Sequence, residues 1–205
     1  MQWKGLIDTH AHLDFKAFDK DRAQVISKVR EAGFVGIINV GTDRDTSFQT
    51  VDLVKEHPGF IWGAVGVHPH EAITVTGDVL REIEALSKED GIVAIGEIGL
   101  DFHYNHSPRA IQERVFRAQL RLARSLGLPV IIHSREAEKE TLAILKEENG
   151  RDIGGVMHCF TGSAMMAKEC LAMGFFLGLG GVLTFPKAQN LRDIADYVPL
   201  ENILL

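Results

Sequence analysis

Two histidines near the start of the chain, His10 and His12, are separated by a single residue and follow a short apolar run. In an extended segment, residues two apart point to the same side, so both imidazoles can face one point. Burying two imidazoles side by side is costly unless a metal ion or an acidic group lies between them. The pair therefore predicts a shared metal ion, with ordinary hydrogen bonding as the alternative.

Other polar residues follow later apolar runs in the same way. Glu97 comes directly after the fourth run, in a near-core position where an unpaired carboxylate would be costly. His68, His133 and His158 follow the third, fifth and sixth runs. A single histidine at such a place is more often structural than a ligand, but the set as a whole favours a metal centre. We predict that its ligands are His10, His12, Glu97, His133 and His158.

The elements that must position these residues are eight short apolar runs. They are residues 6–7, 36–40, 61–65, 92–95, 129–132, 155–157, 175–179 and 203–205. Most are continuously apolar, which is typical of parallel strands buried on both faces. Segments with helical periodicity lie between them, at about 25–29, 79–86, 111–126, 137–148, 164–173 and 188–197.

Strands that alternate with helices predict an α/β fold, either a (β/α)8 TIM barrel or a doubly wound open sheet. The sequence contains no G-x-G-x-x-G or Walker A pattern, which weakens the nucleotide-binding alternative. Polar residues at the carboxyl ends of several separated strands require a nearly closed circle, because a barrel collects its chemistry at that rim. We therefore expect a barrel.

Composition restricts the function further. The chain has 205 residues and a mass of 22.7 kDa, so we expect one domain over residues 1–205. A net charge of −6 argues against gripping nucleic acid through a broad basic face. We expect no signal peptide, membrane span or obligate protein partner. Only two cysteines occur, which fits a reducing compartment, so we expect a cytoplasmic protein.

The segments that carry these polar residues closely resemble the TatD family of metal-dependent deoxyribonucleases. They are residues 8–14, 66–69, 96–101, 132–135 and 158–162. The resemblance implies a TIM-barrel hydrolase that cuts DNA phosphodiester bonds, often as a 3′→5′ exonuclease on a single strand or a 3′ end.

The resemblance also implies two divalent ions, Mg²⁺, Mn²⁺ or Zn²⁺. His10 and His12 would hold one ion, and Glu97 would be the catalytic residue that bridges to the second. His133 and His158 would complete the second site. Other family positions near the site, with roles in supporting the ligands or contacting substrate, are His68, Asp101 and Arg135.

One family feature has no counterpart in residues 1–205, an aspartate that follows strand 8. We therefore expect a barrel truncated at strand 8, without its C-terminal end, and weak or absent nuclease activity. Two alternatives stay open. One is an amidohydrolase or phosphotriesterase acting on a small molecule, although such barrels commonly place a carboxylated lysine where Glu97 stands. The other is an inactive metal-binding fragment whose strands 1 and 7 have unpaired edges.

Overall fold

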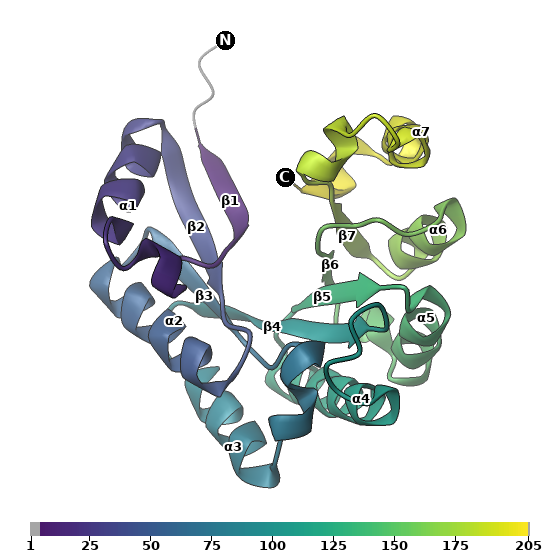
Figure 1. Cartoon of the computed structure of the whole chain (residues 1–205), viewed down its shortest axis with the longest axis horizontal. Coiled ribbons are helices and arrows are strands. Elements are labelled where there is room, and N and C mark those ends of the chain that lie inside the picture. Colours follow the sequence, from purple (N-terminus) through teal and green to yellow (C-terminus); the bar gives the residue numbers. More distant parts are fainter. Residues whose placement is uncertain (1–4, 205) are drawn as a thin grey trace.

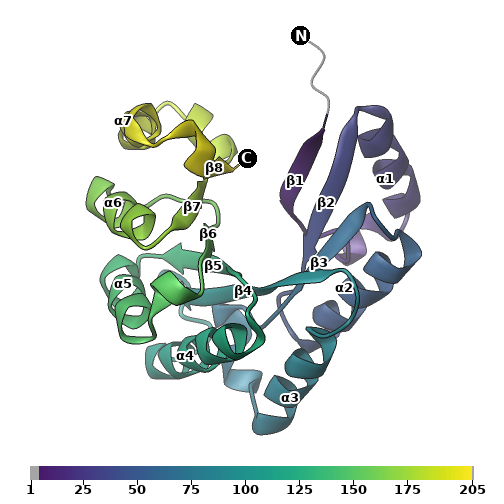
Figure 2. The same ribbon diagram turned by 180° about the vertical axis from the view of Figure 1, so that it is seen from behind.

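Eight parallel strands follow one another around a single curved sheet in the computed structural model, which describes residues 5–204 (Figures 1 and 2). The strands are β1 (Leu6–Ala11), β2 (Phe34–Val40), β3 (Ile61–Val65), β4 (Ile92–Asp101), β5 (Val130–Arg135), β6 (Gly155–Met157), β7 (Phe175–Gly178) and β8 (Ile203–Leu204). Their order in the sheet is their order in the chain. This order confirms the barrel and excludes a doubly wound sheet.

The barrel is open along one seam. Between residues 5 and 204 the structure contains no pairing of β1 with β8, and Figure 2 shows the two strands facing each other across a gap. Strand β8 pairs with β7 through Leu177–Ile203 and Gly178–Leu204. The expectation that strand 7 has a free edge is therefore wrong, because the short eighth strand covers it. The last residue of the expected strand 203–205 lies outside the described residues.

In the described part of the chain, seven α-helices lie outside the strands. They are α1 (Arg22–Glu31), α2 (Arg44–Glu56), α3 (Gly77–Leu86), α4 (Arg109–Leu126), α5 (Glu138–Glu147), α6 (Ala164–Ala172) and α7 (Gln189–Tyr197). Short 3₁₀ turns occur at Lys16–Phe18, Pro69–Thr74, Gly150–Asp152, Gly181–Thr184 and Leu200–Asn202. No helix within residues 5–204 has the length and apolar character to cross a membrane.

Helix α2 was not predicted by the apolar spacing. A capping box starts it: the Asp43 carboxylate accepts the Thr46 N–H at 2.7 Å, and the Thr46 hydroxyl accepts the Asp43 N–H at 2.9 Å. These two bonds satisfy N–H groups that the first turn of a helix leaves unpaired. The D-x-x-T sequence was a readable signal for this helix start.

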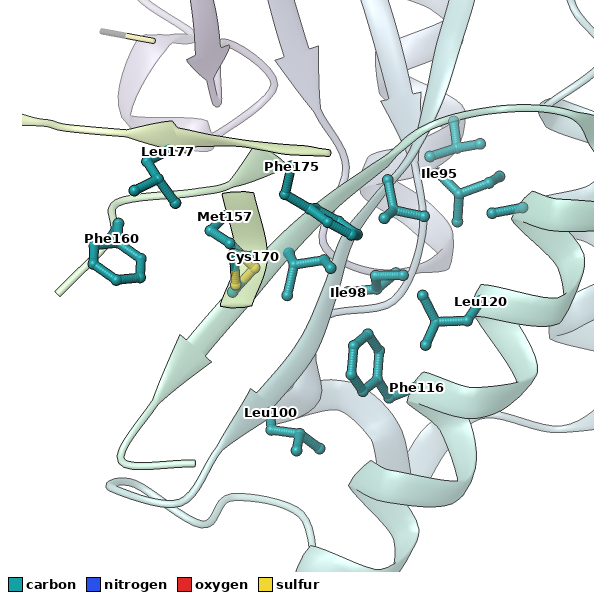
Figure 3. Close-up of a cluster of buried hydrophobic side chains, with 14 of the residues drawn as sticks. Ile95, Ile98, Leu100, Phe116, Leu120, Met157, Phe160, Cys170, Phe175 and Leu177 are labelled. Atoms are coloured by element: carbon teal, nitrogen blue, oxygen red, sulfur yellow. The ribbon is translucent and has the colours of Figure 1, made fainter. Parts of the chain in front are cut away.

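The sheet separates two apolar layers. A small inner cluster of Val40, Ala64, Ala94 and Ile131 fills the barrel, and short side chains suit its narrow interior. The larger cluster lies between the strands and the helices. In Figure 3, Ile98 of β4 lies beside Phe116 and Leu120 of α4 within this outer layer.

An irregularity in β4 determines where Glu97 points. Register with β5 shifts between Ile95 and Ile98, and Ile98 packs in the outer cluster although Ala94 belongs to the inner one. Regular alternation would place residues 94 and 98 on the same face. The extra residue reverses this alternation, so Glu97 shares the inner face with Ala94.

Close contact between β4 and β5 requires a glycine at position 99. Gly99 pairs with His133 and has φ +135°, and a Cβ there would lie 2.0 Å from the His133 carbonyl oxygen. Only glycine adopts this backbone without strain and without a clash. The pairing brings His133 next to the inner face that carries Glu97.

The loop after β1 is held by Asn39, a fully buried residue of β2. Its side-chain oxygen accepts the Leu13 N–H at 2.6 Å, and its amide donates to Asp14 Oδ1 and Thr50 Oγ1, each at 2.8 Å. These bonds join the segment after His12 to β2 and α2. Asn39 therefore fixes the position of the histidine pair.

We expect Asn39→Ala to lower the free energy of unfolding by about 3 kcal/mol, because it leaves a buried N–H and a buried carboxylate without their partner. Urea unfolding followed by circular dichroism measures this change. The matched control is Asn190→Ala, which removes only one exposed 3.4 Å bond to the Gly162 carbonyl. A loss no larger than that of the control would contradict the role assigned to Asn39.

Candidate metal centre

The residues predicted as metal ligands converge at the carboxyl ends of the strands. Glu97 lies at the middle of this group, and its side chain is only 5% exposed. One carboxylate oxygen, Oε2, lies 3.4 Å from His10 Nε2 and 3.7 Å from His12 Nε2. The other, Oε1, lies 3.1 Å from His133 Nδ1 and 3.8 Å from His68 Nε2. The two oxygens therefore face two different sets of imidazoles.

Two groups of donor atoms are close enough to hold an ion. His10, His12 and Glu97 form one, and His68, Glu97 and His133 form the other, with the donor atoms of each group within 4.8 Å of one another. Imidazole and carboxylate together suit Zn²⁺ and Mn²⁺. Glu97 belongs to both groups, so the geometry fits a carboxylate shared between two ions.

The histidine pair has the geometry that its spacing predicted. His10 Nε2 and His12 Nε2 lie 3.1 Å apart, and His12 Nδ1 lies 2.8 Å from the Val40 carbonyl oxygen. Because Nδ1–H donates to that carbonyl, the Nε2 lone pair of His12 is free to bind an ion. His10 Nδ1 is buried and has no hydrogen-bond partner among the described residues.

Glu97 stays ionised despite its burial. Burial raises its pKa, but hydrogen bonds from His10 and His133 and the electrostatic interaction with His10 outweigh this effect and hold the pKa well below its usual value. A permanent carboxylate among imidazoles creates a site for a cation. The centre is therefore already negatively charged at its middle when no ion is bound.

Asp101 is a second carboxylate, and it holds two histidines of the site. Its Oδ2 accepts hydrogen bonds from His133 Nε2 and His70 Nε2, each at 3.0 Å. Burial raises the pKa of Asp101, yet the Tyr104 N–H and these two histidines lower it to about 2. A carboxylate behind a histidine fixes which ring nitrogen faces an ion.

His133 lies between the two carboxylates, with Nδ1 toward Glu97 and Nε2 toward Asp101. Burial lowers its pKa, but the bonds and charges of Glu97 and Asp101 raise it overall. Without an ion, both ring nitrogens can therefore carry protons. An ion at Nδ1 would displace one proton and leave Nε2–H with Asp101.

His158 does not belong to either donor group. Its ring stacks on the His10 ring with centroids 3.4 Å apart. Burial and the charge of His10 lower the pKa of His158 to about 4, so the ring is neutral with a lone pair available. His158 therefore contacts the candidate centre through His10, and its role as a metal ligand stays a prediction.

His68 has a different arrangement. Its Nδ1 accepts the backbone N–H of His70 at 3.2 Å, which places its own proton on Nε2, toward Glu97. Burial lowers the pKa of His68 to about 3, so the ring is neutral. In this tautomer His68 is a hydrogen-bond donor rather than an ion ligand.

Arg135 lies at the rim, away from Glu97. Its guanidinium carbon lies 4.8 Å from the centre of the Tyr104 ring, and the residue lines a cavity of about 620 Å³ with residues of α5 and α6. His70 is a site residue that the sequence reasoning left without a role. The H-P-H spacing of His68 and His70 was the signal, since it resembles the spacing of the first pair.

Barrel, rim position and paired histidine–carboxylate groups together define a metal-dependent hydrolase of the TIM-barrel class. The family model for TatD related DNase matches residues 7–205, and the chain belongs to this family of metal-dependent nucleases. The aspartate expected after strand 8 has no counterpart among residues 1–205, so its role stays a prediction.

Individual relatives agree with this membership. The chain is 42% identical to the uncharacterized metal-dependent hydrolase YabD of Bacillus subtilis, over 98% of this chain and 78% of that protein. It is 39% identical to the 3′-5′ ssDNA/RNA exonuclease TatD of Pantoea sp., over 98% of this chain and 77% of the relative. The crystal structure of YJJV, a TatD homolog from Escherichia coli K12, matches with a TM-score of 0.90 at 31% identity, over 98% of this chain and 77% of that one.

The low pKa of His68 predicts a pH dependence of stability. Between pH 6.5, its ordinary pKa, and about pH 3, the unfolded chain binds a proton on His68 that the folded protein does not. Folding stability therefore falls as pH falls through this window. In EDTA, His68→Asn should flatten the decline of the unfolding free energy from pH 6.5 to pH 4. His57→Asn, outside the cluster, is the control, and equal slopes in wild type and His68→Asn would contradict the assignment.

Proposed function

We propose that this protein is a divalent-metal-dependent exonuclease that removes nucleotides from the 3′ end of single-stranded DNA. The observation that carries the proposal is Glu97, whose two carboxylate oxygens face two separate sets of histidines at the barrel rim. The direction and the single-stranded preference are supported by the name of the Pantoea relative, which is called a 3′-5′ ssDNA/RNA exonuclease.

The proposed ligands divide between two ions. His10 and His12 bind the first with Glu97 Oε2, which is supported by the 3.4 and 3.7 Å approaches of their Nε2 atoms. Glu97 Oε1 and His133 would hold the second, and His158 would be its third ligand, which is supported by its neutral ring and by its place against the His10 ring. His68 keeps its proton and donates to Glu97 or to the substrate.

When bound, such ions lower the pKa of a water molecule and offset phosphate charge during phosphodiester hydrolysis. The protein supplies the remaining parts. Glu97 lies between both ligand sets, and Asp101 orients His133. His68 Nε2 lies 3.8 Å from Glu97 Oε1, and its N–H can donate to a phosphate oxygen of the substrate. Arg135 at the rim adds a planar cation suited to the next phosphate.

The overall charge agrees with a small contact area. A net charge of −6 does not favour wrapping around a duplex, whose binding is dominated by phosphate neutralisation. An end of one strand that enters the rim needs only a few phosphate contacts, and bound ions supply local positive potential. The site therefore suits a strand end better than an internal duplex site.

The alternative of a small-molecule amidohydrolase places different demands on the fourth strand. The corresponding position of β4 carries Glu97, whose carboxylate lies among imidazoles and belongs to both candidate ion groups. A pair of ions would stabilise the attacking and leaving oxygens of a phosphodiester displacement. Hydrolysis of cyclic amides or lactones with no action on DNA would support the alternative.

Cleavage of end-labelled oligonucleotides tests the proposal. With Mg²⁺ or Mn²⁺, a single strand that carries a 5′ label should shorten stepwise from its 3′ end, and a 3′-blocked strand should resist. Glu97→Gln should lower the rate at least about 100-fold, because it removes the charge that both ligand sets share. Glu31→Gln, an exposed residue at the end of α1, is the matched control. Fragments of random internal length, or cleavage unaffected by the 3′ block, would overturn the 3′→5′ assignment.

A further inference from the structure

Two large aromatic side chains lie exposed beside the candidate metal centre. Phe15 follows β1 and is 42% exposed, and Tyr104 follows β4 and is 52% exposed. Neither ring is needed to fill the core, because both leave much of their surface to solvent. Exposed aromatic rings next to a reaction centre are candidates for contact with a ligand.

Tyr104 is fixed relative to the metal centre through Asp101. The Oδ1 atom of Asp101 accepts the backbone N–H groups of His103 at 3.0 Å and Tyr104 at 2.8 Å. The Oδ2 atom of the same carboxylate accepts the hydrogen bond from His133. One buried carboxylate therefore positions both a candidate ion ligand and the loop that carries the exposed ring.

The Arg135 guanidinium lies over the Tyr104 ring. The guanidinium carbon of Arg135 lies 4.8 Å from the ring centre, and His106 stacks nearly parallel to it, with centroids 5.6 Å apart and planes 8° apart. Arg135 makes no hydrogen bond or ion pair with an acidic group that the structure shows among residues 5–204, so its donors are open to a phosphate. A ring beside a guanidinium offers a stacking surface together with an anion contact.

Phe15 lies beside the other group of candidate ligands, the pair His10 and His12. Its ring stacks on His12 with centroids 4.7 Å apart and planes 9° apart. It lines a cavity of about 260 Å³ together with His68, His70 and Glu97. The His70 ring in turn contacts Tyr104 edge-on at 5.6 Å. Phe15 therefore lines the cavity on the side of β1. Tyr104 follows β4 and lies next to His70, which is also a lining residue.

We propose that Phe15 and Tyr104 are stacking surfaces for unpaired nucleobases, one on each side of the metal centre, with Arg135 bound to the adjoining phosphate. Bases in a duplex have both faces covered by their neighbours, whereas bases of a single strand can stack on aromatic rings with little regard to sequence. The two rings therefore select single-stranded substrates. This inference rests on the proposed nuclease function and adds the residues that recognise its substrate.

Binding in EDTA, where no cleavage occurs, tests the inference apart from catalysis. Fluorescence anisotropy compares a labelled short oligothymidylate with an abasic strand of the same length and charge. The wild-type protein should bind the base-containing strand more tightly. Tyr104→Ala and Phe15→Ala should each weaken its binding roughly tenfold and leave the abasic strand unaffected. Tyr104→Phe, which keeps the ring, should retain the preference.

Tyr197→Ala is the matched control, since Tyr197 is also exposed and lies near a cation, Lys168 at 5.8 Å, but belongs to α7. Thermal melting verifies that each variant is folded. Equal affinity of the wild-type protein for both strands, or an equal loss for both strands in Tyr104→Ala, would overturn the stacking role. A base preference in EDTA together with no metal-dependent cleavage would instead overturn the proposed nuclease function and leave the stacking role standing.

Discussion

The structure of the site depends on one buried carboxylate surrounded by imidazoles. A buried and unpaired carboxylate at Glu97 would strongly destabilise the folded protein. Four histidines from three neighbouring parts of the rim, His10, His12, His68 and His133, stabilise its charge. The irregularity in β4 turns Glu97 inward, and the glycine at position 99 lets β5 approach closely enough to deliver His133. The fold therefore brings these histidines to the positions from which they stabilise the negative charge of Glu97.

A second carboxylate extends this arrangement outward. Asp101 has one oxygen on His70 and His133 and the other on the loop that presents Tyr104. A displacement of Asp101 would therefore alter ion binding and substrate contact together. This connection gives a physical reason why the G-E-x-G-x-D segment holds both carboxylates four residues apart on one strand.

Much of this could be predicted from the sequence, because the apolar runs mark the strands and the polar residues that follow them favour the rim of a barrel. All eight strands were anticipated, and His10 and His12 face one point as their spacing requires. Helix α2 was missed because its start is signalled by a capping box rather than by a clear apolar stripe. The Glu97 side chain points to the inner face because the register between β4 and β5 shifts. The proton of His68 lies on Nε2 because Nδ1 accepts the His70 N–H. Such features arise from pairing in three dimensions and leave no simple periodic signal.

The most direct test of the central claim is a crystal structure of the protein with Mn²⁺, using anomalous scattering to locate the ions. We expect two ions flanking Glu97, one in contact with each carboxylate oxygen. His10 and His12 should bind the first, and His133 and His158 the second. Ions bound without Glu97, or His68 in the place of His158, would contradict this arrangement.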